Sequence, residues 1–207
     1  MNIHWKSFFA GLCSLWLVGC GPAAKDDTIR IAVIPKGTTH EFWQSIHAGA
    51  RKAEKELTAQ GKSVEIIWKG PLKEDDRDQQ MGLVENFTVK GVDGIVLAPL
   101  DAKALVRPVE SAQKSGIPVV IIDSGLETTN YVSFVATDNL KGGEMAGNYM
   151  AQQLENKGKV ILLRYAVGSA STENRENGFL KALAKYPDIE LNSSDLYAGP
   201  ARETAYQ

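Results

Sequence analysis

Cysteine is almost absent from this sequence. The 207 residues include only Cys13 and Cys20, both ahead of the first strand-like run, which excludes a disulfide framework or a cysteine metal site in the rest of the chain. No apolar run reaches the roughly 20 residues that a membrane-spanning helix needs. The formal net charge of −2 excludes the strongly basic surface with which proteins bind nucleic acid. We therefore expect no nucleic-acid partner and no membrane-spanning helix in the mature chain.

Motifs for catalysis are also missing. The sequence has no glycine-rich phosphate loop and no pattern that indicates a nucleophile, histidine and acid triad. His40-Glu41 starts like the zinc motif H-E-x-x-H, but Gln44 occupies the position of the second histidine. We therefore expect no metal, no cofactor and no enzyme. An exported α/β enzyme that uses Asp123 as an acid is the alternative from another class.

The N-terminal segment is typical of an exported lipoprotein. Residues 17–20 (LVGC) follow a short apolar stretch and form a lipobox, at which bacterial lipoproteins are cleaved and lipidated on the new N-terminal cysteine. We expect residues 1–19 to be a signal peptide, Cys20 to carry the lipid and residues 20–27 to form a tether. The alternative is a buried N-terminal helix. Lipidation places the mature chain in the cell envelope, attached to the membrane through the lipid alone.

Apolar runs rich in β-branched residues alternate with segments of helical periodicity, which predicts βαβ units and parallel sheets. The expected strands of a first series lie at 29–34, 64–68, 94–98 and 118–122. A second series begins after Asn130, with strands at 131–136, 159–164 and 189–197 and helices at about 140–154 and 173–186. Glycines that end the helices of the first series stand at 61, 91 and 116.

This alternation predicts an α/β protein of two Rossmann-like lobes with parallel sheets. The first lobe is expected at 28–130 and the second at 131–207, with the chain crossing between them near 131–137. Residues 201–207 are typical of the opening turn of another helix, whose apolar face would lack partners at a chain end. We therefore expect the second lobe to be incomplete.

Two local patterns carry structural predictions. The helix expected over 140–154 contains Gly142, Gly143 and Gly147, which lower its helix propensity and indicate close packing against a neighbour. Acidic residues are concentrated around 74–78, ahead of an expected helix, where carboxylates favour the positive end of the helix dipole. We interpret these carboxylates as solvated capping residues.

Candidate ligand-binding residues follow the expected strands, because ligands of open α/β sheets bind beyond the carboxyl ends of the strands. A sugar site needs flat aromatic surfaces and charged groups that make paired hydrogen bonds. Phe42 and Trp43 provide the first, and Asp123 and Arg175 provide the second. Each also has an ordinary alternative as a core aromatic, a turn cap or a surface ion pair. Their shared place at one sheet edge favours a binding site.

Short stretches along residues 28–207 match one known pattern. They are IRIAVI at 29–34, EFW at 41–43, GVDGIVLAP at 91–99, GIPVV at 116–120, ATDN at 136–139, and Arg175 followed by Gly178-Phe179. Together they resemble the type I periplasmic sugar-binding proteins, the ribose-binding group of ABC importer receptors. The resemblance implies an α/β fold of the periplasmic-binding-protein type I, and a chain that runs roughly a hundred residues further. On that basis the sequence is expected to be truncated at its C-terminus.

The resemblance also implies roles for single residues. The family's aromatic pair clamps the sugar ring, which points to Phe42 and Trp43, while its aspartate and arginine bind hydroxyls, which points to Asp123 and Arg175. Segments 34–36, 70–71 and 123–124 are more similar to the rhamnose and autoinducer-2 receptors, where a lysine contacts the ligand. The candidate site is therefore Lys36, His40, Phe42, Trp43, Asp123, Ser124 and Arg175, with His40 and Ser124 standing where ribose receptors have asparagine and arginine.

The function implied by the resemblance is that of a substrate-binding lipoprotein of a carbohydrate ABC importer. Such a receptor captures a monosaccharide or a similar small polyol between its lobes and presents it, as a monomer, to the transmembrane subunits of the permease. A receptor for a sugar or an autoinducer-2-like ligand that feeds a transmembrane signalling protein is the alternative. Both readings expect binding without a reaction.

Overall fold

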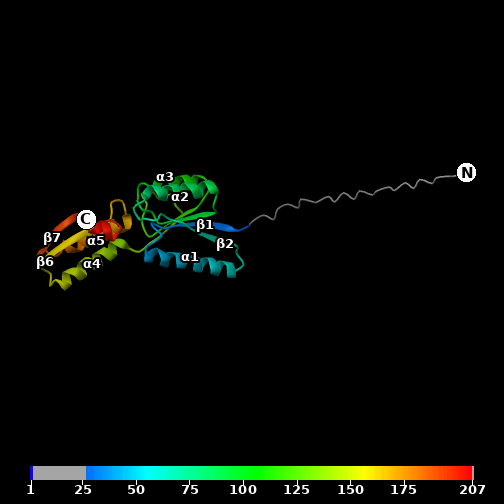
Figure 1. The fold of residues 1–207 in the computed structure, drawn as a ribbon. Coiled ribbons are helices and arrows are strands. Elements are labelled where there is room, and N and C mark those ends of the chain that lie inside the picture. The colour runs from blue at the N-terminus through cyan, green and yellow to red at the C-terminus, as the bar shows by residue number, and fades with distance from the viewer. Residues whose placement is uncertain (2–26, 207) are drawn as a thin grey trace.

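The computed structural model describes Met1 and residues 27–206, which form two α/β units that follow one another along the chain (Figure 1). The expected signal peptide and the lipid-attachment residue Cys20 lie outside the described residues, as does almost all of the expected tether. Across the part of the chain that is described, no helix has the length and apolarity needed to cross a membrane.

The first unit is a parallel sheet covered by helices on both faces. Its strands are β1 (Ile29–Ile34), β2 (Val64–Trp68), β3 (Gly94–Leu97), β4 (Val119–Ile122) and β5 (Ser133–Val135), in the order β2-β1-β3-β4-β5. Helices α2 (Arg77–Lys90) and α3 (Val106–Lys114) cover one face, and α1 (Glu41–Ala59) lies along the other (Figure 1). These are the βαβ units that the alternating pattern predicts.

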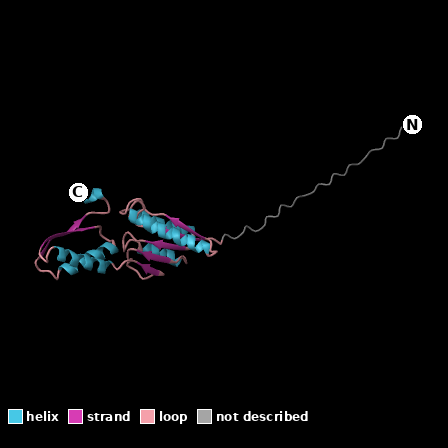
Figure 2. Ribbon diagram, turned by 90° about the horizontal axis from the view of Figure 1, so that it is seen from below, coloured by secondary structure: helices cyan, strands magenta, loops and turns pink. Residues whose placement is uncertain are grey.

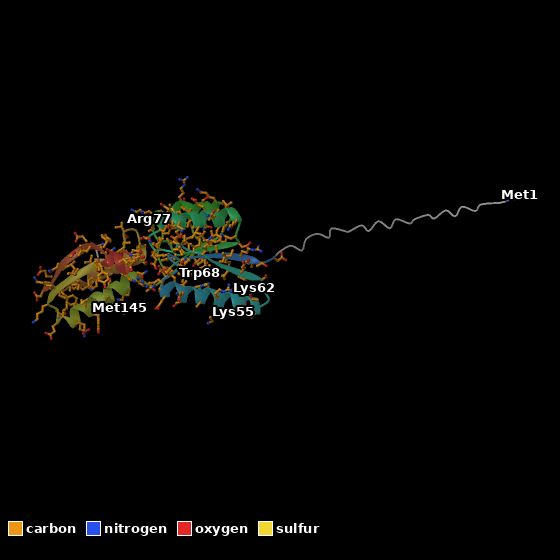
Figure 3. All side chains as sticks on the ribbon, in the orientation of Figure 1. Met1, Lys55, Lys62, Trp68, Arg77 and Met145 are labelled. Atoms are coloured by element: carbon orange, nitrogen blue, oxygen red, sulfur yellow. The ribbon has the colours of Figure 1, made fainter. Side chains whose placement is uncertain are left out.

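The core of the first unit lies between the sheet and the pair α2 and α3. Its fully buried side chains include Ile34, Ile95, Leu97, Val119 and Ile121 from three adjacent strands. The α1 side is packed less tightly, because an apolar groove of about 280 Å³ separates the helix from the sheet. At one end of this layer the ring of His47 stacks on Trp68, with 4.5 Å between ring centroids; Trp68 is labelled in Figure 3.

Strand β5 belongs to the first sheet, which differs from the expected grouping. The sequence places a strand at 131–136 at the head of the second series, whereas in the structure Ser133–Val135 pairs in parallel with β4. The periodicity of a segment indicates that it is a strand but not which strand it pairs with. The chain therefore leaves the first sheet only after β5.

The second unit has two parallel strands, β6 (Gly158–Arg164) and β7 (Ile189–Tyr197), packed against α4 (Asn139–Gln153) and α5 (Ala170–Leu183) (Figure 2). A short helix, α6 (Arg202–Ala205), follows where the sequence predicts an opening turn. The second unit has a small core, which consists of Ala151, Val160, Leu183 and Ile189.

Helices α4 and α5 touch at two of the three glycines that the sequence singles out. A methyl group on Gly147 would lie 2.7 Å from the Cβ of Ala182, and one on Gly143 would collide with the carbonyl of Arg175. Gly142 faces open space, with nothing within 4 Å. The expected close packing is therefore confirmed at Gly143 and Gly147 only.

This contrast predicts opposite effects of two neighbouring substitutions. Gly143→Ala should lower the free energy of unfolding by roughly 1–3 kcal/mol, because the added methyl forces α4 away from α5. Gly142→Ala should raise it by up to about 1 kcal/mol, because alanine is the better helix former and meets no neighbour. Urea unfolding followed by circular dichroism measures both. Equal effects of the two variants would show that α4 and α5 are not packed through Gly143.

Candidate functional site

A cavity of about 360 Å³ opens between the two units, where the carboxyl ends of β1 and β4 face the start of α5. Its walls combine aromatic, cationic, acidic and hydroxyl groups. The lining residues are Lys36, His40, Phe42, Trp43, Glu74, Asp123, Tyr165, Ser171, Thr172, Arg175 and Pro200. The structure thus brings together all the candidate residues except Ser124. This is the edge of the sheet at which open α/β folds bind ligands.

The aromatic wall is formed by the first turn of α1. His40 is the N-cap residue, and its Nδ1 accepts a hydrogen bond from the Phe42 amide at 3.2 Å. The rings of Phe42 and Trp43 meet edge to face, with centroids 4.9 Å apart. Trp43 is 2% exposed and Phe42 is 45% exposed, so Phe42 presents the more open apolar surface. Trp43 is buried in the core and also lines the cavity, so it has both of the roles that the sequence left open.

Lys36 lies at the end of β1 and is buried at the floor of the cavity. Its ammonium donates hydrogen bonds to the hydroxyls of Ser169 and Ser171, each at 3.1 Å, and pairs with Asp123 at 3.5 Å. The two serines belong to the second unit, so this one group joins the two units. Burial lowers the pKa of the Lys36 ammonium below its usual value, and the neighbouring Asp123 carboxylate opposes part of that shift.

Asp123 follows β4 in an uncommon backbone conformation. Its φ of 61° lies in the left-handed region, which aspartate tolerates better than most residues other than glycine. The Asp123 amide donates to the carbonyl of Val135 at 3.0 Å, which ties this turn to β5. The strained turn directs the carboxylate toward Lys36 and the cavity, and such backbone outliers concentrate at functional sites.

Ser124 is fully buried and lies behind the cavity wall. Its hydroxyl accepts a hydrogen bond from the amide of Ser171 at 3.0 Å. Ser171 is in the first turn of α5, whose N-cap residue Ser169 makes no side-chain cap bond of its own. Ser124 therefore caps α5 from the other unit and occupies one of its free amide groups.

Arg175 reaches the cavity from α5 of the second unit. Within the described residues its guanidinium has no hydrogen-bond or ion-pair partner. Its backbone packs against Gly143 of α4, which fixes the position from which the side chain extends. The guanidinium is thus a cation with donors available to an oxygen-rich ligand.

Among the lining residues that were absent from the sequence-based site, Glu74 and Tyr165 are bonded to each other. Glu74 accepts hydrogen bonds from Trp43 Nε1 at 2.7 Å and from the Tyr165 hydroxyl at 2.8 Å. The capping interpretation holds for Asp76, which caps α2 through the Gln79 amide at 2.9 Å, but it is wrong for Glu74. Burial and the nearby Glu74 carboxylate raise the pKa of the Tyr165 phenol. Only the place of Tyr165 directly after a strand would have pointed to it.

The arrangement is suited to a neutral ligand with one apolar face and many hydroxyls. Phe42 supplies the apolar contact, while Arg175 and Asp123 supply charged donors and acceptors. The described residues contain no group of three histidine, cysteine, aspartate or glutamate side chains that would hold a metal ion.

Comparison with known proteins finds a matching family and sugar-binding relatives. Residues 31–207 match a family described as periplasmic binding protein domain. A xylitol-binding protein of Mycolicibacterium smegmatis is 32% identical over 189 residues, which are 90% of this chain and 52% of that protein. The chain thus spans about half the length of this relative.

Solved structures of sugar-binding proteins share the fold. A carbohydrate transporter solute-binding protein of Agrobacterium radiobacter, crystallised with D-arabinose, is 35% identical with a TM-score of 0.77, over 83% of this chain and 58% of that one. The fructose-binding periplasmic domain of a hybrid two-component system is 30% identical with a TM-score of 0.71, over 80% and 53% of the two chains. These relatives are named for what they bind and not for a reaction.

The buried ammonium predicts a pH dependence of stability. Because the folded-state pKa of Lys36 is lowered below 10.5, the native state releases this proton before the unfolded state does, and stability rises as the pH increases between the two values. Relative to Lys36→Met, the wild-type chain should therefore gain stability as the pH rises toward 10.5. Urea unfolding of both proteins over this rise in pH measures the difference. Parallel pH profiles would contradict the burial of a charged Lys36.

Proposed function

Because the chain belongs to the periplasmic binding protein domain family, we propose that it is the substrate-binding component of a carbohydrate importer and captures a monosaccharide or a similar small polyol. The cavity between the units is the observation that carries this proposal. It collects aromatic surface and charged hydrogen-bonding groups from both units. The binding of xylitol and D-arabinose by the relatives, as their names state, supports the same class of ligand.

The sugar is proposed to lie with its C–H face on Phe42, next to the cavity-lining Trp43. Asp123 accepts hydrogen bonds from its hydroxyls, and Arg175 donates to its oxygens. Lys36 and His40 border the same space. Lys36 contributes chiefly by holding the Asp123 carboxylate in place, because its donors already point to Asp123 and to two serines.

Binding is proposed to act as a population shift. Asp123 belongs to the first unit and Arg175 to the second, so a sugar that touches both favours the arrangement in which the units are close together. The transmembrane subunits of an ABC permease are the proposed readers of that difference. The receptor acts as a monomer, with one lobe built on the first sheet, which includes β5, and the other on the second unit.

The proposed location is the cell envelope, on the outer side of a membrane. Residues 1–19 act as the signal peptide, and Cys20 carries the lipid that tethers the mature chain through residues 20–27. The description of the family as periplasmic supports this location.

A sensory receptor is the second candidate. The likeness to the periplasmic domain of a hybrid two-component system favours it, because that domain has the same fold and binds fructose. In such a protein ligand occupancy is passed to a transmembrane signalling protein instead of a permease. The cavity and its ligand class are the same in both cases.

The sugar site predicts a specific loss of affinity in an arginine variant. Arg175→Ala should raise the dissociation constant by roughly 10- to 100-fold, as expected when charge-assisted hydrogen bonds are lost. Arg107→Ala, which removes an exposed arginine outside the cavity, is the matched control and should bind like the wild type. Titration of a panel of aldoses and polyols, followed by NMR shifts of the Trp43 indole group, detects even weak binding. The proposal fails if no sugar shifts that signal.

The lipid anchor predicts a change of cell fraction. Cys20→Ala removes the only sulfur to which the lipid can be attached, so the variant should leave the membrane fraction for the soluble envelope fraction or retain its signal peptide. Cys13→Ala is the control and should stay with the membrane. Intact mass of the purified proteins distinguishes these forms. A wild-type chain without an added lipid mass would refute the anchor.

A further inference from the structure

Glu74 is the one carboxylate of the cavity whose two oxygens are both engaged by neighbouring side chains. Oε1 accepts from the indole of Trp43, and Oε2 accepts from the hydroxyl of Tyr165. The two bonds are 2.7 Å and 2.8 Å long, which is well within hydrogen-bond distance. A carboxylate held in this way is oriented by the protein and not by a ligand.

The two donors come from different units. Trp43 is in the first turn of α1, and Glu74 lies in the loop ahead of α2, both in the first unit. Tyr165 directly follows β6 of the second unit and is separated from Glu74 by 91 positions. The Glu74 carboxylate therefore links the aromatic wall of the cavity to the opposite unit.

The surroundings of Glu74 make this link specific. Gly37 packs against it so closely that a methyl group there would lie 2.6 Å from Glu74 Cγ, so an alanine at position 37 would push the Glu74 side chain aside. The raised pKa of the Tyr165 phenol keeps the hydroxyl protonated and able to donate. The neighbouring Asp75 is exposed and makes no side-chain bond among the described residues.

We propose that Glu74 is a positioning residue that fixes the ring of Trp43 and draws Tyr165 onto the cavity, so that it sets both the shape of the sugar site and the closeness of the two units. The part of this inference that concerns sugar affinity rests on the proposed function. The bridge itself does not, because Trp43, Glu74 and Tyr165 are in contact in the protein alone.

The bridge is tested first without sugar, by hydrogen exchange of the Trp43 indole N–H measured by NMR. Glu74→Gln replaces a charged acceptor with a neutral one, and Gly37→Ala displaces the unchanged carboxylate; each should reduce the protection of this proton about tenfold. Asp75→Asn removes the same charge one residue away and should leave protection unchanged. Tyr165→Phe should also leave it unchanged, because the bond between Trp43 and Glu74 remains.

Sugar affinity is measured next on the same variants. Glu74→Gln and Tyr165→Phe should each raise the dissociation constant about tenfold, and the double variant should do little more, because both changes break the same contact between the units. Asp75→Asn should bind like the wild type. Additive losses in the double variant would overturn the proposed coupling.

The outcomes separate the two proposals. Unchanged protection of the Trp43 indole in both Glu74→Gln and Gly37→Ala overturns the bridge, whatever the sugar affinity. If the protection pattern holds but the wild-type chain binds no sugar, the bridge stands and the proposed function fails. Thermal unfolding of each variant shows that it is folded, and Tyr165→Phe provides a test that leaves the loop of Glu74 intact.

Discussion

The two units of this protein meet around a buried ammonium group. Removing a charge from water costs several kcal/mol unless it is surrounded by hydrogen-bonding partners, and Lys36 finds these partners on both sides of the junction. Asp123 comes from the first unit, while Ser169 and Ser171 come from the second. The end of β1, the turn after β4 and the start of α5 must therefore converge on one point, and the rest of the cavity is arranged around it.

The remaining contacts at the junction support the same arrangement. Ser124 caps α5 from across the junction, and the Ala102 amide donates to the carbonyl of Gly168 at 2.8 Å. The close packing of α4 and α5 at Gly143 carries Arg175 to the cavity edge. Polar bonds thus hold the start of α5 in place, while helix packing within the second unit determines which side chain it presents to a ligand.

Local patterns predicted most of the secondary structure, because a strand or helix is recognised by the spacing of its own apolar residues. The strands at 29–34, 64–68 and 189–197 form with the expected bounds. The grouping of β5 was wrong, because the periodicity of a segment indicates a strand but does not show that this strand pairs with β4. Ser124 was predicted as a ligand contact from resemblance, whereas in the structure its hydroxyl is used by a helix amide.

By itself the sequence determined the class of the fold, the edge of the sheet where polar and aromatic residues collect, and the family to which the chain is similar. Only the tertiary structure decided which of those polar groups meet. Glu74 looked like one more carboxylate ahead of a helix, and its partner Tyr165 lies 91 positions away. The physical reason is that propensity and periodicity act over a few neighbouring residues, while the hydrogen bonds of a buried polar group are set only when distant segments have packed together.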